Sequence, residues 1–336
     1  MQPIIRLGEE VLRRMPLEFV EEERDGVRLS SLDAPLGDDL GVTKRDLVDH
    51  LDAVADRLVP LLTGRPLSVV RVRPGQAPFM QKNVVKGAPD WVRTVPVWAE
   101  ASHREIHHVL CDDRRTLLWL ANQRAVEFHV PFFVAGAEAE PTGIVLDLDP
   151  PEGADFGVVV QAAELVRRAL ADAGLAGAVK TSGSKGVHVV VPVRGVPPED
   201  AAAATRALAA RAAALDPDLA TTAYIREDRH GRVFLDSTRS GSSTIVAAYS
   251  PRIHPGLPVS APVAWADLPS VQPGDVTVRT APERLGDGDP WRALLPDPQE
   301  LPADLVAEGH AIPVARVQAM HEGRRRARAR RAEAGD

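Results

Sequence analysis

The clearest alternation of hydrophobic and polar positions lies in residues 143–149. Successive side chains of a strand point to opposite faces, so this pattern predicts a strand on which Asp147 and Asp149 share one face. The two prolines at 150–151 cannot continue a hydrogen-bonded ladder and end the strand. Two adjacent carboxylates repel each other unless a cation or a proton lies between them. Taken alone, this short pattern fits either a divalent-metal site or a capped strand end.

Apolar residues at helical spacing predict the helices, and runs of β-branched residues predict further strands. Thr43 begins a capping-box pattern, and the stripe that follows ends before Gly64. The predicted helices cover residues 43–62, 114–123, 155–174 and 199–215, with a last one near 314–331. The predicted strands are 67–73, 126–130, 143–149, 178–181, 187–193, 233–236 and 244–249, with a strand-rich region at 93–109.

The remaining N-terminal segments are predicted to be irregular. Residues 1–40 are polar with a solvated turn at 21–26, and a Pro/Gly loop precedes Gln81. The order of elements, with a β-α-β-β unit in residues 143–193, predicts an α/β (α+β) fold. We expect a mixed sheet that carries helices and gathers its carboxylates on one face.

Composition limits the class of protein. The chain has 336 residues with 44% hydrophobic content, enough for one large domain or two lobes. Its one cysteine, Cys111, excludes an internal disulfide framework and fits a reducing compartment. Residues 1–15 lack a secretory apolar segment, and no apolar run is long enough to span a membrane, so a cytoplasmic location is expected.

The formal net charge is −7, so the chain as a whole does not attract polyanions such as nucleic acids. Any site that binds a polyanion must therefore be a local patch of positive charge. One such patch is the Gly-rich turn at 182–186, whose backbone N–H groups and Lys185 ammonium suit phosphate oxygens. Another is the arginine-rich segment at 324–331, which fits a solvated tail or a nucleic-acid contact.

A third carboxylate extends the chemistry, since Asp236 ends the predicted strand 233–236. Asp147, Asp149 and Asp236 together could hold two hard cations about 3.5–4 Å apart, the arrangement that clamps both oxygens in phosphoryl transfer. The Gly-rich turn is not a Walker loop, because its lysine is not followed by Ser or Thr at the required spacing. Nucleotidyl transfer or its hydrolytic counterpart is therefore indicated.

Several of these motifs, taken in order, resemble the archaeo-eukaryotic primase superfamily, and within it the polymerase domain of bacterial ATP-dependent DNA ligase D. The three main motifs are residues 146–150, 179–188 and 233–236. Supporting matches lie at residues 41–44, 65–67, 79–82, 127–129 and 248–252, so the likeness covers about residues 40–290.

The resemblance implies a primase-like fold of mixed sheets with an RRM-like catalytic core. It divides the chain into an N-terminal lobe at 1–140, a catalytic lobe at 141–290 and an arginine-rich helical tail at 291–336. It implies that Asp147, Asp149 and Asp236 bind two Mn²⁺ or Mg²⁺ ions. The residues implied to bind the incoming nucleotide are His129, Ser182, Lys185, His188, Arg229 and Arg252.

The implied activity is a metal-dependent DNA/RNA polymerase that adds nucleotides, from NTP or dNTP, to DNA primer ends or short gaps, as in end-joining repair. The residues implied to contact DNA are Lys44, Phe79, Met80 and Lys82. Ku and a separate DNA ligase are the implied partners in a nucleoid-associated setting, since the chain has no room for ligase and nuclease domains.

Two positions depart from the family pattern. A lysine that contributes to 5′-phosphate binding in the family is Ala34 here, and one of two adjacent aromatic residues is Met80. A thioether stacks on bases less strongly than an aromatic ring.

Two other functions compete with the polymerase. A two-metal nuclease or phosphodiesterase needs an activated water, and the sequence offers no distinct base beside the aspartates. A catalytically silent DNA-end-binding module would gain nothing from such crowded charge.

Overall fold

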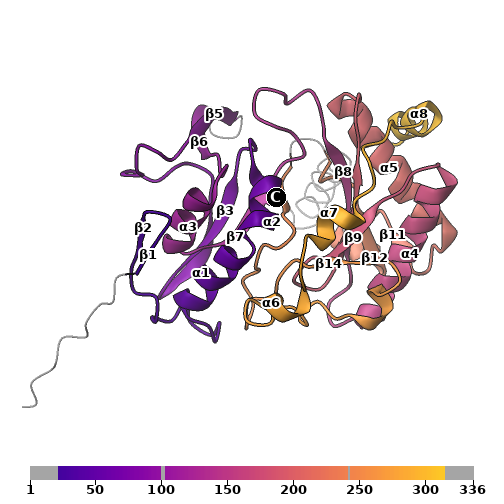
Figure 1. Cartoon of the computed structure of the whole chain (residues 1–336). Helices are drawn as coiled ribbons and strands as arrows, with labels where there is room; N and C mark the ends of the chain where they lie inside the picture. Colours follow the sequence, from indigo (N-terminus) through magenta and orange to yellow (C-terminus); the bar gives the residue numbers. More distant parts are fainter. Residues whose placement is uncertain (1–21, 100–102, 241–242, 315–336) are drawn as a thin grey trace, which may run out of the picture.

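The computed structural model describes residues 22–99, 103–240 and 243–314, which form two lobes that lie side by side (Figure 1). Each lobe is built around its own cluster of buried hydrophobic side chains. Among the described residues, no helix is long and apolar enough to cross a membrane. The expectations for residues 1–21 lie outside the described residues.

The first lobe contains a sheet with the strand order β13-β7-β3-β4, in which β13 is Ile245–Val246, and a separate two-stranded β5-β6 pair. Thr43 and Asp46 form the predicted capping box at the start of α1, and Asp113 caps α3. Its elements are β1 (Glu22–Arg24), β2 (Val27–Leu29), α1 (Lys44–Ala53), α2 (Ala55–Leu62), β3 (Ser68–Arg73), β4 (Gln76–Gln81), β5 (Thr94–Ala99), β6 (Arg104–Val109), α3 (Arg114–Asn122) and β7 (Ala125–Val130).

The second lobe contains a six-stranded sheet with the order β11-β12-β8-β10-β9-β14. Its elements are β8 (Gly143–Asp149), α4 (Phe156–Asp172), β9 (Ala178–Thr181), β10 (Val187–Pro192), α5 (Pro198–Leu215), β11 (Ala220–Thr221), η1 (Arg226–Arg229), β12 (Val233–Asp236) and β14 (Pro262–Val263). After β14 come η2 (Leu268–Ser270), α6 (Ala281–Arg284), α7 (Pro290–Leu294) and α8 (Ala303–Ala311).

The alternation in β8 decides which face of this sheet is available for chemistry. Leu146 and Leu148 are buried with Val159 and Val166 of α4 and with the apolar side of α5. The aspartates of β8 therefore lie on the opposite face, away from the helices. The mixed sheet with helices on one face agrees with the predicted α/β (α+β) fold.

The chain passes between the two lobes more than once. Between β12 and β14 the chain returns to the first lobe, where β13 (Ile245–Val246) pairs antiparallel with β7. Ile245 and Ala247 belong to the buried cluster of the first lobe, as does Val145 of β8. The segment between β12 and β14 therefore packs near the face of the second sheet that carries the aspartates.

The structure corrects several predictions. Residues 22–29 form the hairpin β1-β2 rather than only a turn, and Asp49 and Asp52 hold its Arg24 by ion pairs. The helix predicted over 43–62 is two helices that meet at Val54.

Further corrections concern loops and the C-terminal region. The Pro/Gly loop before Gln81 is the strand β4, paired with β3 across a register shift. The strand predicted over 244–249 is limited to Ile245–Val246. The three helices α6, α7 and α8 were not predicted, whereas the helix expected near 314–331 lies beyond the described residues except at its first position.

Candidate active site

Strand register brings the predicted acidic residues together. Asp147 is the direct antiparallel partner of Asp236 on β12 and of His188 on β10. Directly opposed residues project to the same face of a sheet, so these three side chains and Asp149, two positions further along β8, share one face. His188 Nε2 lies 3.4 Å from Asp147 Oδ1.

Arg239 lies across the two opposed carboxylates. Its Nε lies 3.3 Å from Asp236 Oδ2 and 3.7 Å from Asp147 Oδ2. The other oxygen of Asp236, Oδ1, accepts a hydrogen bond of 2.8 Å from the backbone N–H of Thr238. This arrangement places a cation against the carboxylate pair at the centre of the site.

Burial and mutual repulsion control how these carboxyl groups ionise. Burial, together with the charges of Asp147 and Asp236, raises the pKa of Asp149 to about 6, although Lys185 and Arg229 oppose the shift. Burial also acts to raise the pKa of Asp147, but its neighbours, His188 first among them, outweigh burial and lower it. Asp149 thus lacks a sufficient cationic partner.

Hard divalent cations fit this donor set. Carboxylate oxygens are their preferred protein ligands, and the negative charge of the cluster exceeds what Arg239 neutralises. In the part of the chain that the structure describes, no three carboxylate, imidazole or thiolate groups are already arranged around one point as metal ligands. Asp147 and Asp236 face Arg239 instead.

Behind His188 lies a buried lysine. Lys180 Nζ donates to His188 Nδ1 at 2.7 Å and to Ser260 Oγ at 2.6 Å. Ser260 Oγ in turn donates to the carbonyl of Thr181 at 2.8 Å. Burial, followed by the charge of Lys180, lowers the pKa of His188 to about 4. With Nδ1 accepting, the proton of the neutral imidazole lies on Nε2, on the side of Asp147.

The Gly-rich turn between β9 and β10 is held together by Ser182. Its Oγ accepts hydrogen bonds from the backbone N–H of Ser184 at 3.2 Å and of Gly186 at 3.1 Å. Two of the amides predicted to face phosphate are therefore used inside the turn, which corrects that expectation. The side chain of Lys185, by contrast, is exposed and makes no hydrogen bond or ion pair within the described residues.

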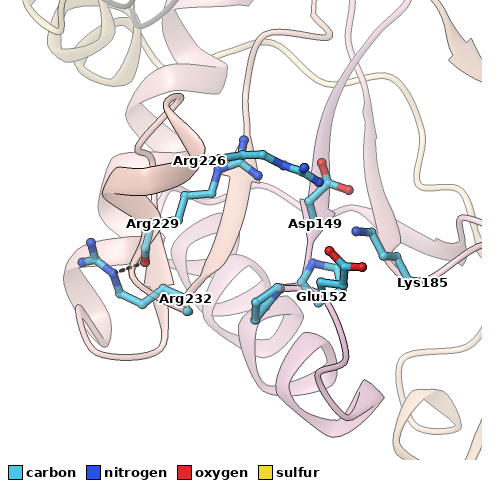
Figure 2. A pocket seen from close by; sticks show the side chains of 9 residues that line it. Asp149, Glu152, Lys185, Arg226, Arg229 and Arg232 are labelled. Atoms are coloured by element: carbon cyan, nitrogen blue, oxygen red, sulfur yellow. Dashed lines mark hydrogen bonds between the residues drawn. The ribbon is translucent and has the colours of Figure 1, made fainter. Parts of the chain in front are cut away.

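A cavity of about 400 Å³ opens beside Asp149. Figure 2 shows Lys185 pointing toward Asp149 and Glu152, with arginines of η1 and the following turn on the other side. Arg229 lines this cavity, but its guanidinium lies 3.9 Å from the centre of the Phe234 ring and its Nε donates to the carbonyl of Ala223. Arg229 is thus held by the protein while its charge remains near Asp149.

The first lobe reaches the same region through β7. Glu127 Oε2 lies 2.9 Å from His129 Nε2, and Glu127 Oε1 lies 3.1 Å from Arg252 Nε. Burial acts to raise the pKa of Glu127, but His129 and Arg252 outweigh it and lower the pKa to about 2. Arg252 Nη1 donates to the carbonyl of Ser182 at 2.8 Å, so this ion pair links β7 to the Gly-rich turn.

The four residues predicted to contact DNA lie in different environments. Lys44 is 3% exposed, and its Nζ donates to the carbonyl of Ser30 and to Asn122 Oδ1, both at 2.6 Å. Burial, together with Arg124, lowers the pKa of Lys44 to about 8. The structure thus holds Lys44 inside the first lobe and does not bring it to the carboxylate site.

Phe79, Met80 and Lys82 lie on and just after β4, an edge strand of the first sheet. Met80 is 50% exposed, whereas the Phe79 ring packs against the guanidinium of Arg73 at 4.8 Å. Of these three residues, Met80 and Lys82 are exposed to solvent.

Sequence analysis did not assign a role to Arg239, Glu127 or Lys180. Period-2 spacing could have placed Glu127 on the face of His129, and Arg239 follows Asp236 by three residues. Nothing in the sequence reports that Lys180 is buried against His188, since that contact depends on the pairing of β9 with β10.

Opposed acidic residues on the open face of a mixed sheet, beside a lysine-bearing turn, are the arrangement expected of a nucleotidyltransferase. The sequence model of the family described as LigD, primase-polymerase domain, matches residues 43–291. The chain therefore belongs to the LigD primase-polymerase domain family.

Curated relatives carry the same name. A bifunctional non-homologous end joining protein LigD of Bacillus subtilis is 33% identical over 83% of this chain and 46% of its own length. A multifunctional non-homologous end joining DNA repair protein LigD of Mycobacterium tuberculosis is 36% identical over 72% of this chain and 33% of its own length. The chain spans less than half the length of these relatives.

A solved structure shares the fold. The polymerase domain from Mycobacterium tuberculosis ligase D, in complex with DNA, superimposes with a TM-score of 0.72 at 32% identity. The match covers 81% of this chain and 98% of that one. The predicted fold and family are thereby confirmed.

Proposed function

We propose that this chain is a divalent-metal-dependent polymerase that adds ribo- or deoxyribonucleotides to DNA primer ends at gaps and breaks, in repair by end joining. One arrangement carries the proposal: Asp147 is opposed by Asp236 on one side and by His188 on the other, beside the exposed Lys185. The relatives named for end joining, and the related polymerase domain solved with DNA, support this direction.

Asp147, Asp149 and Asp236 would hold Mn²⁺ or Mg²⁺. When bound, a pair of such ions supplies charge stabilisation to the attacking and leaving oxygens of an in-line displacement. In that displacement the primer 3′-hydroxyl oxygen forms a bond to the α-phosphorus, and the bond from the α-phosphorus to pyrophosphate breaks. Two of the three carboxylates lie on neighbouring strands in direct register, which fixes their spacing before substrate arrives.

The cationic residues would bind the triphosphate. Lys185 is free to reach phosphate oxygens, and Arg229 and Arg252 hold their charges in place through contacts within the protein. A charge that is already oriented needs little reorganisation when the substrate binds. His188 Nε2–H would donate to a phosphate oxygen, with the ring held by Lys180.

The DNA would lie along the exposed edge of the first lobe. Met80 and Lys82 would contact a base and a phosphate, and Phe79 would be available to stack if the strand end opens. End joining also requires recognition and sealing of the break, for which Ku and a DNA ligase are the partners that we propose.

Primer extension tests the proposal directly. We expect the purified chain to lengthen a labelled primer on gapped DNA with Mn²⁺ and NTP or dNTP. Asp147→Asn should lower the rate by at least about 100-fold, because it removes one charged ligand at the centre of the site. Asp172→Asn, at the end of α4, is the matched control and should retain wild-type activity.

The outcomes separate the candidate functions. Shortening of the primer in a lane without nucleotide would indicate a nuclease, and a mobility shift without any change in length would indicate a binding module. Undiminished extension by Asp147→Asn would overturn the proposed active site.

A further inference from the structure

Arg239 is held at the candidate site by charge rather than by directed hydrogen bonds. Its Nε is buried and within 3.3 Å of Asp236 Oδ2, but the geometry does not meet the requirements of a hydrogen bond. The side chain as a whole is 43% exposed, so its outer end reaches solvent. An arginine held in this way can leave without breaking a well-formed hydrogen bond at Nε.

The position of Arg239 competes with that of a metal ion. Its Nε faces Oδ2 of both Asp147 and Asp236. A divalent ion that binds these oxygens cannot occupy the same space as the guanidinium, and two close cations also repel each other. Metal binding by this pair therefore requires Arg239 to move away.

We propose that Arg239 is a displaceable counter-ion. It offsets part of the negative charge of the Asp147–Asp236 pair until a divalent metal replaces it, and it thereby lowers the metal affinity of the enzyme. The inference rests on the proposed function, because it takes these aspartates as metal ligands. Arg239 thus stabilises the unliganded site at the cost of weaker metal binding.

The size of the effect follows from population arithmetic. If the state with Arg239 displaced makes up about 10–20% of the protein without metal, the apparent Kd for metal is about five- to tenfold higher than the intrinsic Kd. Arg239→Gln removes the competing cation and keeps a polar side chain. We expect its Kd for Mn²⁺, measured by electron paramagnetic resonance without nucleotide, to fall by about five- to tenfold.

A matched control separates displacement from a general loss of positive charge. Arg226 lines the cavity beside Asp149, and Arg226→Gln removes the same charge without touching the Asp147–Asp236 pair. We expect its Kd for Mn²⁺ to stay within twofold of wild type. An equal gain of affinity in both variants, or no gain in Arg239→Gln, would overturn the inference.

Thermal unfolding gives a second readout. In EDTA, Arg239→Gln should unfold about 2 °C below wild type, because the carboxylate pair is left without its counter-ion. With saturating Mn²⁺ the two proteins should unfold at the same temperature. An unchanged Tm in EDTA would contradict the counter-ion role.

Asp147→Asn distinguishes this inference from the proposed function. If Mn²⁺ binds Asp147→Asn as tightly as wild type, the metal site itself is wrongly assigned. If Asp147→Asn abolishes Mn²⁺ binding but Arg239→Gln leaves the Kd unchanged, the active-site assignment stands and only the role of Arg239 fails.

Discussion

Gly186 offers the sharpest structural prediction, because its neighbour leaves no room for a side chain. A Cβ on Gly186 would lie far inside the 3.0 Å that real Cβ atoms keep, against the carbonyl oxygen of Leu148, with the carbonyl carbon at 3.2 Å. Leu148 lies in β8, between Val187 of β10 and Leu235 of β12. Gly186→Ala must therefore separate the Gly-rich turn from the strand that carries both aspartates.

The cost can be estimated from the contacts that would be lost. Gly186 accepts a hydrogen bond from the N–H of Ser182 at 2.8 Å and donates to Ser182 Oγ at 3.1 Å. Each lost hydrogen bond costs about 1 kcal/mol, and overpacking a well-packed site adds about 1–3 kcal/mol. We expect Gly186→Ala to lower the free energy of unfolding by about 3–5 kcal/mol.

Urea unfolding followed by circular dichroism is the assay, with Gly274→Ala as the matched control. Nothing lies within 4 Å of a Cβ at Gly274, and its φ is not positive, so that change should stay within about 0.5 kcal/mol of wild type. Because the turn carries Lys185, Gly186→Ala should also raise the KM for nucleotide. A loss below about 1 kcal/mol would refute the reasoning, since it would mean that the turn moves freely against β8.

Two further predictions concern buried basic groups. Burial lowers the pKa of His50 to about 4, although its hydrogen bond to the Tyr249 carbonyl opposes the shift, so the unfolded chain takes up a proton first as the pH falls from about 6.5 to 4. Wild type should lose up to about 3 kcal/mol of its free energy of unfolding over that range. An equal loss in His50→Gln, measured by urea unfolding at each pH, would contradict this. Lys180→Met removes the hydrogen bonds to His188 Nδ1 and Ser260 Oγ, and should lower kcat/KM for nucleotide incorporation about tenfold. Its free energy of unfolding should fall by about 1–3 kcal/mol, because His188 Nδ1 is left buried without a hydrogen-bond donor. Unaltered kcat/KM would show that His188 does not need Lys180.

Local pattern was sufficient for the elements that carry the aspartates. Alternation along β8 predicted that Asp147 and Asp149 share a face, and the structure agrees because the other face packs on α4 and α5. The capping box at Thr43 was also predictable, since it depends on side chains three residues apart.

Contacts between distant segments were not predictable from one sequence. Asp147 faces both Asp236 and His188 because β8 lies between β12 and β10 in the sheet. The alternation of polar and apolar residues along one strand does not predict which strands are its neighbours. The burial of Lys44 was missed for the same reason, because its partners Ser30 and Asn122 come from other elements of the first lobe.

The return of the chain to β13 has a consequence for dissecting this protein. A fragment that begins after β7 would contain β13 without the strand it pairs with, and a fragment that ends at β7 would lose an edge of its sheet. Because Ala247 and Val145 are buried in the same cluster, separating the halves would also expose apolar surface next to the aspartates. The smallest piece able to hold the acidic residues in register therefore includes both halves, because the backbone passes from one lobe to the other more than once.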